Sequence, residues 1–355
     1  MRVAALFLIV AGWIAVPLLP AQTPVSVSTP TLAQRAESGD AQAQFELARA
    51  YEDGKGVSQD DARAAEWFRK SAEQGNAQAQ NSLGVMYAQC RGVNCDRQEA
   101  VRWYKKAARQ GLPEAIYNIA ISYYNGEGVE ANLNDAATWM MVASRKGDTQ
   151  AAEALKRISQ ELHQRMEISK FQLAQLYNKG DELPQDLPAA ASLYRELAEE
   201  KEGMWYNDRS RYELCQIYAT GKGAPQDYAQ AKLWCKKSLM PFSYVLLGRM
   251  AEQGLGQSQN LHEALDYYKQ AALHALPDGY MDTARLELAS GVHDAQQKAY
   301  FWYLIAVRRK TPGAEEKLRE IAANLTDKEI TKQQKQAAAW LAMSDGDRFK
   351  NLKKH

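Results

Sequence analysis

The chain has 355 residues, and its 44 lysines and arginines nearly balance its 43 aspartates and glutamates, which gives a net charge of +1. A charge so close to zero argues against a dedicated nucleic-acid surface, so no nucleic-acid partner is expected. The four cysteines are an even number, which allows every one of them to be paired.

The first residues have the pattern of an export signal. One arginine is followed by an uncharged, mostly apolar run and then by small and polar residues, which predicts a signal peptide over 1–21. Cleavage after Ala21 would place Leu19 three residues before the cut, where smaller residues are usual, so an uncleaved N-terminal anchor remains an alternative. Residues 22–30 are predicted to form an extended spacer. No later segment is apolar enough for a membrane span, so none is expected after cleavage.

Residues 41–148 contain a repeat of 36 residues. Three blocks, 41–76, 77–112 and 113–148, carry a tyrosine, a glycine and a tryptophan in register. The aligned residues are Tyr51, Tyr87 and Tyr123; Gly56, Gly92 and Gly128; and Trp67, Trp103 and Trp139. A phosphate-binding loop is normally needed once, whereas a structural turn is needed in every unit. The glycine pair in YEDGKGVS (51–58) is therefore interpreted as a recurring turn.

Each unit is expected to fold as two helices joined by this turn. Apolar residues at helical spacing mark one stripe before the glycines and another after them. In the first block these residues are Ala43, Leu47, Ala48 and Tyr51, then Ala64, Trp67, Phe68 and Ser71. Glycine ends the first helix cheaply, Asp60 or Asp61 is placed to cap the second, and Gly75 closes it. One such hairpin cannot bury both stripes alone, so the units must stack into a solenoid.

The repeat continues in weaker form through the second half of the chain. Residues 31–40 are predicted to be a lone N-terminal capping helix, and 154–162 resembles 317–325, which precedes a helix with an L-T-x-x-E start. The chain is therefore divided into one array over 31–166 and another over 167–345, each with capping helices. One continuous superhelix is the alternative, because no Gly/Ser-rich linker separates the halves. The basic tail, 346–355, is expected to be frayed and solvated.

The pattern A-x-A-Q-x-x-L-G-x-x-Y-x-x-G-x-G-V, followed by a W-Y/F pair and A-A-x-x-G, resembles the Sel-1-like repeat family. Residues 77–112 carry the closest match, with the consensus residues Leu83, Gly84, Tyr87, Gly92, Val93, Trp103, Tyr104, Ala107 and Ala108. The resemblance implies an all-α, right-handed α/α solenoid related to tetratricopeptide repeats, of about seven units. It also implies a bacterial protein and, with the leader, a periplasmic location.

The cysteines are predicted to form two disulfides, each within one repeat. Cys90 and Cys95 flank one turn, with Cys90 in place of the first glycine. Cys215 and Cys235 align with Ala48 and Phe68, on stripes expected to face each other. Free buried thiols remain the alternative, above all for Cys215 and Cys235.

No catalytic, cofactor-binding or metal-binding residues are predicted. The five histidines show no H-E-x-x-H spacing, and the chain contains no G-x-S-x-G and no phosphate-loop signature. Cys90 and Cys95 lack the second ligand pair that a zinc site needs. An enzyme with a site assembled from distant units is kept as a rival hypothesis.

What remains is the surface of the first helices, which in tetratricopeptide-like solenoids lines the concave face. The fifth position of these helices is mostly aromatic or aliphatic, and it is occupied by Phe45, Asn81, Tyr117, Phe171, Tyr212 and Val245. In the third unit Tyr117, Ile121 and Tyr124 share one helical face. These three, with Phe45 and Glu52, are predicted to form a groove for a protein or peptide. The alternative is that the fifth position packs against the preceding second helix.

The resulting hypothesis is a non-catalytic periplasmic scaffold or adaptor that binds a protein or peptide partner in the cell envelope. One alternative is a module that binds an envelope polymer, peptidoglycan or exopolysaccharide, for which Tyr123, Tyr124 and Glu127 could supply aromatic and acidic groups. Another is a periplasmic regulator of a membrane sensor.

Overall fold

The computed structural model of the chain describes residues 31–162, 166–200, 204–344 and 346–348. The expected signal peptide and spacer, residues 1–30, lie outside the described residues. The described part is entirely helical, with these elements: α1 (Leu32–Glu37), α2 (Ala41–Asp53), α3 (Asp61–Glu73), α4 (Ala77–Gln89), α5 (Arg97–Arg109), α6 (Pro113–Asn125), α7 (Leu133–Arg145), α8 (Thr149–Leu162), α9 (Met166–Lys179), α10 (Leu187–Glu199), α11 (Trp205–Thr220), α12 (Tyr228–Lys237), α13 (Phe242–Gln253), α14 (Leu261–Leu273), α15 (Pro277–Ala289), α16 (Ala295–Arg308), α17 (Ala314–Ala322) and α18 (Asp327–Ala342).

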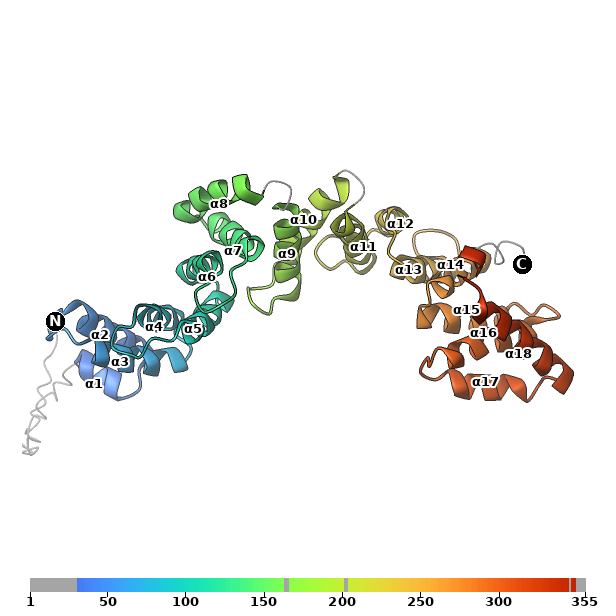
Figure 1. The fold of residues 1–355 in the computed structure, drawn as a ribbon, viewed down its shortest axis with the longest axis horizontal. Helices are drawn as coiled ribbons and strands as arrows, with labels where there is room; N and C mark the ends of the chain where they lie inside the picture. Colours follow the sequence, from blue (N-terminus) through green and yellow to red (C-terminus); the bar gives the residue numbers. More distant parts are fainter. Residues whose placement is uncertain (1–30, 163–165, 201–203, 345, 349–355) are drawn as a thin grey trace, which may run out of the picture.

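Seven helical hairpins follow one another along an elongated arch (Figure 1). They are α2/α3, α4/α5, α6/α7, α9/α10, α11/α12, α13/α14 and α15/α16, and each packs against the next. The chain is therefore an α/α solenoid of about seven units, as predicted. The helix α9 packs on both α7 and α10, so the extra helix α8 does not interrupt the stacking. At the ends, α1 packs on α2, and α17 and α18 pack on α16.

The apolar stripes predicted from the repeat form the core between the helices. In the first unit Ala43, Ala48, Ala64 and Phe68 are completely buried. Alanine dominates these stripes, and its small side chain lets neighbouring helices approach closely. The core is therefore a series of clusters along the solenoid, each shared between adjacent helices, as expected for a stack of repeats.

The first glycine of the turn ends the first helix in the left-handed conformation. Gly54 has φ 67° and ψ 27° at the end of α2. In the next unit Cys90 adopts the same conformation, with φ 61° and ψ 30°. A side chain is strained in this conformation. The disulfide to Cys95 closes the turn around Cys90 and so opposes its relaxation.

The second glycine has a different role, which is contact with the preceding unit. A Cβ atom added to Gly92 would lie 2.0 Å from the carbonyl oxygen of Asp61, at the start of the previous second helix. At Gly128 the corresponding distance, to the carbonyl of Arg97, is 2.1 Å. Gly56 belongs to the first unit and has no such neighbour within 4 Å. The second glycine therefore lets each turn lie directly against the unit before it.

Both predicted disulfides are present, and each stays within one unit. The Cα atoms of Cys90 and Cys95 are 4.4 Å apart, and those of Cys215 and Cys235 are 5.1 Å apart. Cys215 and Cys235 are buried between α11 and α12, where the alignment with Ala48 and Phe68 placed them. The first bridge fixes a turn, and the second ties the two helices of one hairpin together.

The C-terminal end is capped as the sequence predicts, but the basic tail begins differently. Thr326 and Glu329 form a reciprocal capping box at the start of α18. The expectation of a solvated tail is wrong for Arg348, which is buried and donates hydrogen bonds to the carbonyls of Trp340 and Leu341 at 3.0 and 2.9 Å. Carbonyls in the last turn of a helix attract a positively charged group such as this guanidinium. Residues 349–355 lie outside the described residues.

The contact made by the second glycine predicts different effects of the same substitution in two units. Gly92→Ala is expected to destabilise the protein by about 1–3 kcal/mol more than Gly56→Ala, because both introduce a side chain at positive φ but only the first meets the preceding unit. Urea unfolding of the two variants measures the difference. Equal losses of stability would show that the turn does not hold the units together.

The two disulfides are expected to contribute unequally. Replacing Cys215 and Cys235 by alanine should lower the free energy of unfolding by about 3 kcal/mol, and replacing Cys90 and Cys95 by about 2 kcal/mol, because the bridge between Cys215 and Cys235 closes the longer loop. Urea unfolding with and without reductant measures both. Reductant should not destabilise the variant that lacks all four cysteines, and a loss of stability there would contradict the assignment.

Candidate functional site

The structure places Phe45 at the contact between the two helices of its own unit. Its ring centroid lies 5.8 Å from that of Phe68 on α3. Phe171, at the same repeat position, lies 5.9 Å from Tyr194 on α10 and is almost completely buried. In these two units the aromatic ring at the fifth position thus packs on the second helix of its own unit. Phe45 and Phe171 contribute mainly to packing.

Glu52 lies in an ion-pair network between units. Its carboxylate is 3.1 Å from the guanidinium of Arg91 in the next unit, and Arg91 also contacts Asp61 at 2.8 Å. Glu252 occupies the same repeat position and accepts two hydrogen bonds, at 2.6 and 2.8 Å, from Arg285 of its next unit. Both glutamates therefore join consecutive units, which is a structural role.

The three predicted groove residues of α6 differ in their exposure. Tyr117 and Ile121 are partly buried and pack against the main core cluster. Tyr124 leaves 42% of its surface exposed. Of the three residues, only Tyr124 presents an exposed aromatic ring. Tyr117 and Ile121 are partly buried by the core beneath them. The three residues do not meet Phe45, whose ring packs on α3 in the first unit.

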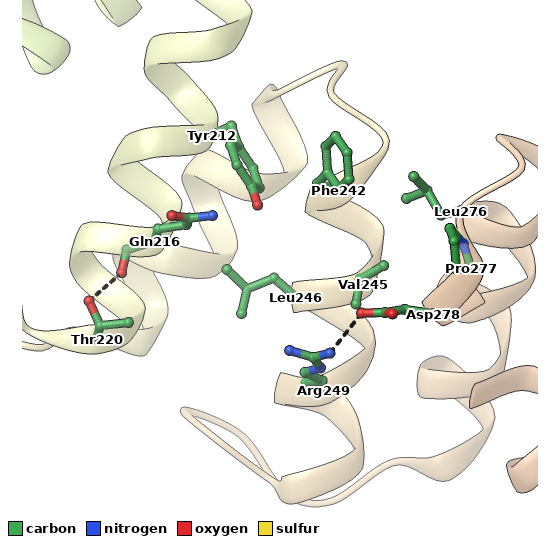
Figure 2. A pocket seen from close by; sticks show the side chains of 10 residues that line it. All are labelled: Tyr212, Gln216, Thr220, Phe242, Val245, Leu246, Arg249, Leu276, Pro277 and Asp278. Carbon is green, nitrogen blue, oxygen red and sulfur yellow. Dashed lines mark hydrogen bonds and ion pairs between the residues drawn. The ribbon is translucent and has the colours of Figure 1, made fainter. Parts of the chain in front are cut away.

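A larger apolar groove crosses the first helices of the fifth, sixth and seventh units (Figure 2). It has a volume of about 330 Å³. Its lining comes from α11, α13 and the start of α15, and comprises Tyr212, Gln216, Thr220, Phe242, Val245, Leu246, Arg249, Leu276, Pro277 and Asp278. The rings of Tyr212 and Phe242 lie with centroids 6.0 Å apart, and Phe242 is 47% exposed. The groove thus presents aromatic and aliphatic surface to a partner.

The fifth unit, which contains Tyr212, is shorter than the first three units. The glycines Gly221 and Gly254 are 33 residues apart, whereas the first three units repeat every 36 residues. The missing residues come from the end of the second helix, so α12 has 10 residues where α3, α5 and α7 have 13. Ser238 occupies the same repeat position as Ser71 and makes the same contact. Its hydroxyl donates a hydrogen bond to the carbonyl of Asp208, and the hydroxyl of Ser71 donates one to the carbonyl of Ala41. The chain then turns at once into α13, with Phe242 as its first residue.

Charged groups border the groove. Arg249 and Asp278 form an exposed ion pair at 3.0 Å, which Figure 2 shows at the end of the groove away from the aromatic rings. Arg209 lies over the ring of Tyr212, with its guanidinium carbon 5.5 Å from the ring centroid. Burial raises the pKa of the Tyr212 hydroxyl, which keeps it neutral. The site therefore combines an apolar floor with a polar rim, as protein-binding surfaces do.

The sequence contained part of this site but did not single it out. Tyr212 and Val245 were named as fifth-position residues, whereas Phe242, Leu246 and Leu276 were not. The 33-residue spacing and the aromatic residue at the second position of the sixth unit are the two signals that could have found the groove.

Two kinds of site were sought in the described residues without success. Within residues 31–348, apart from the gaps given above, no group of three or more His, Cys, Asp or Glu side chains is arranged to hold a metal ion. None of the described helices combines the length and the apolar composition of a membrane span.

The fold and the repeated turn define a protein of the α/α repeat class. The Sel1 repeat family matches residues 41–76, 77–112, 113–148, 168–201, 209–240, 241–275 and 293–310, which together make up more than half of the chain. The chain belongs to the Sel1 repeat family, whose members generally act as scaffolds for protein interactions and are generally non-catalytic. The helix α15 lies outside the matched segments, although it packs as a first helix between α14 and α16.

Solved structures with similar sequences include three bacterial proteins. A protective antigen of uropathogenic Escherichia coli strains with an SLR fold is 27% identical, with a TM-score of 0.42, over 87% of this chain. The chain spans only 63% of that protein. A Sel1 repeat protein from Oxalobacter formigenes is 41% identical over 36% of this chain and 95% of its own, with a TM-score of 0.33. One from Klebsiella pneumoniae subsp. pneumoniae is 20% identical over 72% of this chain and 97% of its own, with a TM-score of 0.26. No curated protein matches the chain.

The ion pair between Glu252 and Arg285 is expected to make the free energy of unfolding depend on pH. Hydrogen bonds from Arg285 hold the pKa of the Glu252 carboxyl below its usual value. A carboxyl whose folded-state pKa is lowered stabilises the fold above its unfolded-state pKa, about 4.3, and this contribution is lost as the pH falls through the folded-state pKa. Because Arg285 is partly exposed, Glu252→Gln should cost only about 1 kcal/mol at neutral pH and almost nothing at low pH.

Urea unfolding at neutral pH and at about pH 3 tests this expectation. The matched control is Asp278→Asn, which removes an exposed ion pair of the same neighbourhood and should leave stability nearly unchanged at both pH values. A cost for Glu252→Gln that does not shrink at low pH would contradict the role of its charge.

Proposed function

We propose that the protein is an exported, non-catalytic scaffold that binds a protein partner through the first-helix face of its solenoid, with the groove of α11, α13 and α15 as the main contact. The observation that carries this proposal is the exposed Phe242 beside Tyr212 in an apolar groove. Exposed aromatic side chains in a concave apolar surface are typical anchors for a partner.

The shape and lining of the groove favour a segment of polypeptide as the bound element. An apolar side chain of the partner can insert beside Tyr212, Phe242 and Leu246. The ion pair of Arg249 and Asp278 supplies both signs of charge at the other end, which suits the polar flanks of a peptide. An amphipathic helix or an extended segment would satisfy both ends.

The face of α6 that contains Tyr117, Ile121 and Tyr124 is proposed as an additional contact of the same partner. Tyr124 provides the exposed ring, and the other two side chains support it from the core. Phe45 and Glu52 take part in packing and in an ion pair between units, so we assign them an indirect role in shaping this face.

Two features support the proposed export to the periplasm. The disulfides Cys90–Cys95 and Cys215–Cys235 leave no free thiol among the described residues, and such pairs persist in oxidising compartments. The N-terminal 21 residues have the composition of a signal peptide. A periplasmic scaffold would find its partner among envelope proteins.

Site-specific photo-crosslinking in cells tests the groove. A photoreactive amino acid at position 246, on the groove floor, is expected to capture one dominant protein. Adding Tyr212→Ala and Phe242→Ala should reduce capture about tenfold or more, because aromatic anchors at interface centres contribute about 2 kcal/mol or more each.

Leu239→Ala is the matched control. Leu239 is the most exposed large apolar side chain described, at 75%, and lies beside the groove without lining it. Its truncation should leave capture unchanged. Capture that survives the double substitution, or that falls equally with Leu239→Ala, would refute the groove as the contact.

A further inference from the structure

A second cleft lies at the C-terminal end of the solenoid, on other helices than the groove. It has a volume of about 520 Å³. Its lining comes from the second helices α14 and α16, from the end of α15 and from the capping helix α18. The groove, in contrast, is lined by the first helices α11, α13 and α15. The two sites could therefore be occupied at the same time.

One wall of the cleft is a rigid aromatic cluster. The ring centroids of Trp302 and Trp340 are 5.7 Å apart, and that of Phe301 lies 5.2 Å from Trp302 and 6.3 Å from Trp340, all in edge-to-face geometry. Arg348 lies over the ring of Trp340, with its guanidinium carbon 4.8 Å from the ring centroid. Trp302 and Trp340 are almost completely buried, so the partly exposed Phe301 offers most of the aromatic surface to an apolar group.

A largely buried glutamine side chain lines the same cleft. Gln333 on α18 is only 6% exposed, and no hydrogen bond of its side chain is found within the described residues. The neighbouring Gln297, by comparison, donates to Glu329 at 2.8 Å. The amide atoms of Gln333 are not among the buried polar atoms that lack a partner, so they reach the open cleft and are available to a ligand. A glutamine amide donates and accepts at once, which matches the N–H and C=O groups of a peptide backbone.

Within the part of the chain that the structure describes, one positively charged side chain of the cleft lining is not in an ion pair. Lys269 and Glu287 form a largely buried ion pair at 2.9 Å, and Lys298 and Asp294 pair at 3.0 Å. Lys332, one residue before Gln333, has no ion pair among the residues that the structure describes. The lining therefore carries an excess of one positive charge, which favours a negatively charged ligand.

We propose that this cleft binds an acidic peptide segment of a second protein. An apolar side chain of the segment packs on Phe301 and Trp340, its backbone pairs with the amide of Gln333, and an adjacent carboxylate contacts Lys332. The segment is recognised by its charge, in contrast to the apolar groove. The inference extends the proposed scaffold function, because a chain with two separate sites can hold two partners side by side.

Selection from a phage-displayed library of random peptides, on the full exported chain, tests the proposal. Peptides with an aromatic or aliphatic residue next to an acidic one are expected to be enriched. Fluorescence anisotropy of an enriched peptide should show an affinity loss of about tenfold for Lys332→Glu. The matched control, Lys335→Glu, makes the same charge change on an exposed position of α18 outside the cleft and should change little.

Gln333→Leu separates binding from folding. Because the amide has no partner, its loss should leave the unfolding midpoint unchanged or raised, while affinity for the peptide falls about tenfold. The combined Tyr212→Ala and Phe242→Ala variant should bind the acidic peptide normally, so the failure of one site does not imply failure of the other. Enrichment of peptides without acidic residues, no enrichment, binding of saccharides instead, or equal effects of Lys332→Glu and Lys335→Glu would each overturn the proposal.

Discussion

The contact between each glycine turn and the unit before it determines the architecture of this protein. The turn of one unit touches the backbone at the start of the second helix of the preceding unit. At Gly92 and Gly128 this contact is too close for a side chain. This contact, together with burial of the alanine-rich stripes, stacks hairpins that could not bury their apolar faces alone. Arginine–glutamate pairs such as Arg285 with Glu252 join the units on the outside. Every surface discussed above depends on this stacking.

The two surfaces proposed for binding lie where the repeat departs from its own pattern. In the sixth unit the exposed second position of the first helix, which is Gln42, Gln78 or Glu114 in the first three units, is Phe242 and lies next to Tyr212. After the last unit, α17 and α18 pack on α16 in place of a further hairpin, and α18 forms one side of the C-terminal cleft. Regular units bury the apolar surface between them. At these two departures, apolar and polar side chains remain accessible to a partner. In the proposed scaffold, the sites of departure from the repeat would bind partners, and the regular repeats would hold these sites in place.

The sequence predicts well what local rules control. The turns, the capping box of Thr326 with Glu329 and both disulfides follow from spacing and from residue type, because each involves one unit or one helix end. Surfaces built by several units were harder to predict. The fifth position looked uniform, yet Phe171 is buried and Tyr212 lines a groove, since the difference depends on how the next unit is placed. The burial of Arg348 could not be predicted, because nothing nearby in sequence reveals that its guanidinium folds back on the carbonyls of Trp340 and Leu341.

Hydrogen exchange of the full chain, alone and with its crosslinked partner, tests the central claim most directly, because it reports on every helix at once. We expect new protection of amides in α11, α13 and the start of α15, with α10 and α12 unchanged. Protection confined to the second helices, or spread evenly along the solenoid, would contradict recognition through the first-helix groove.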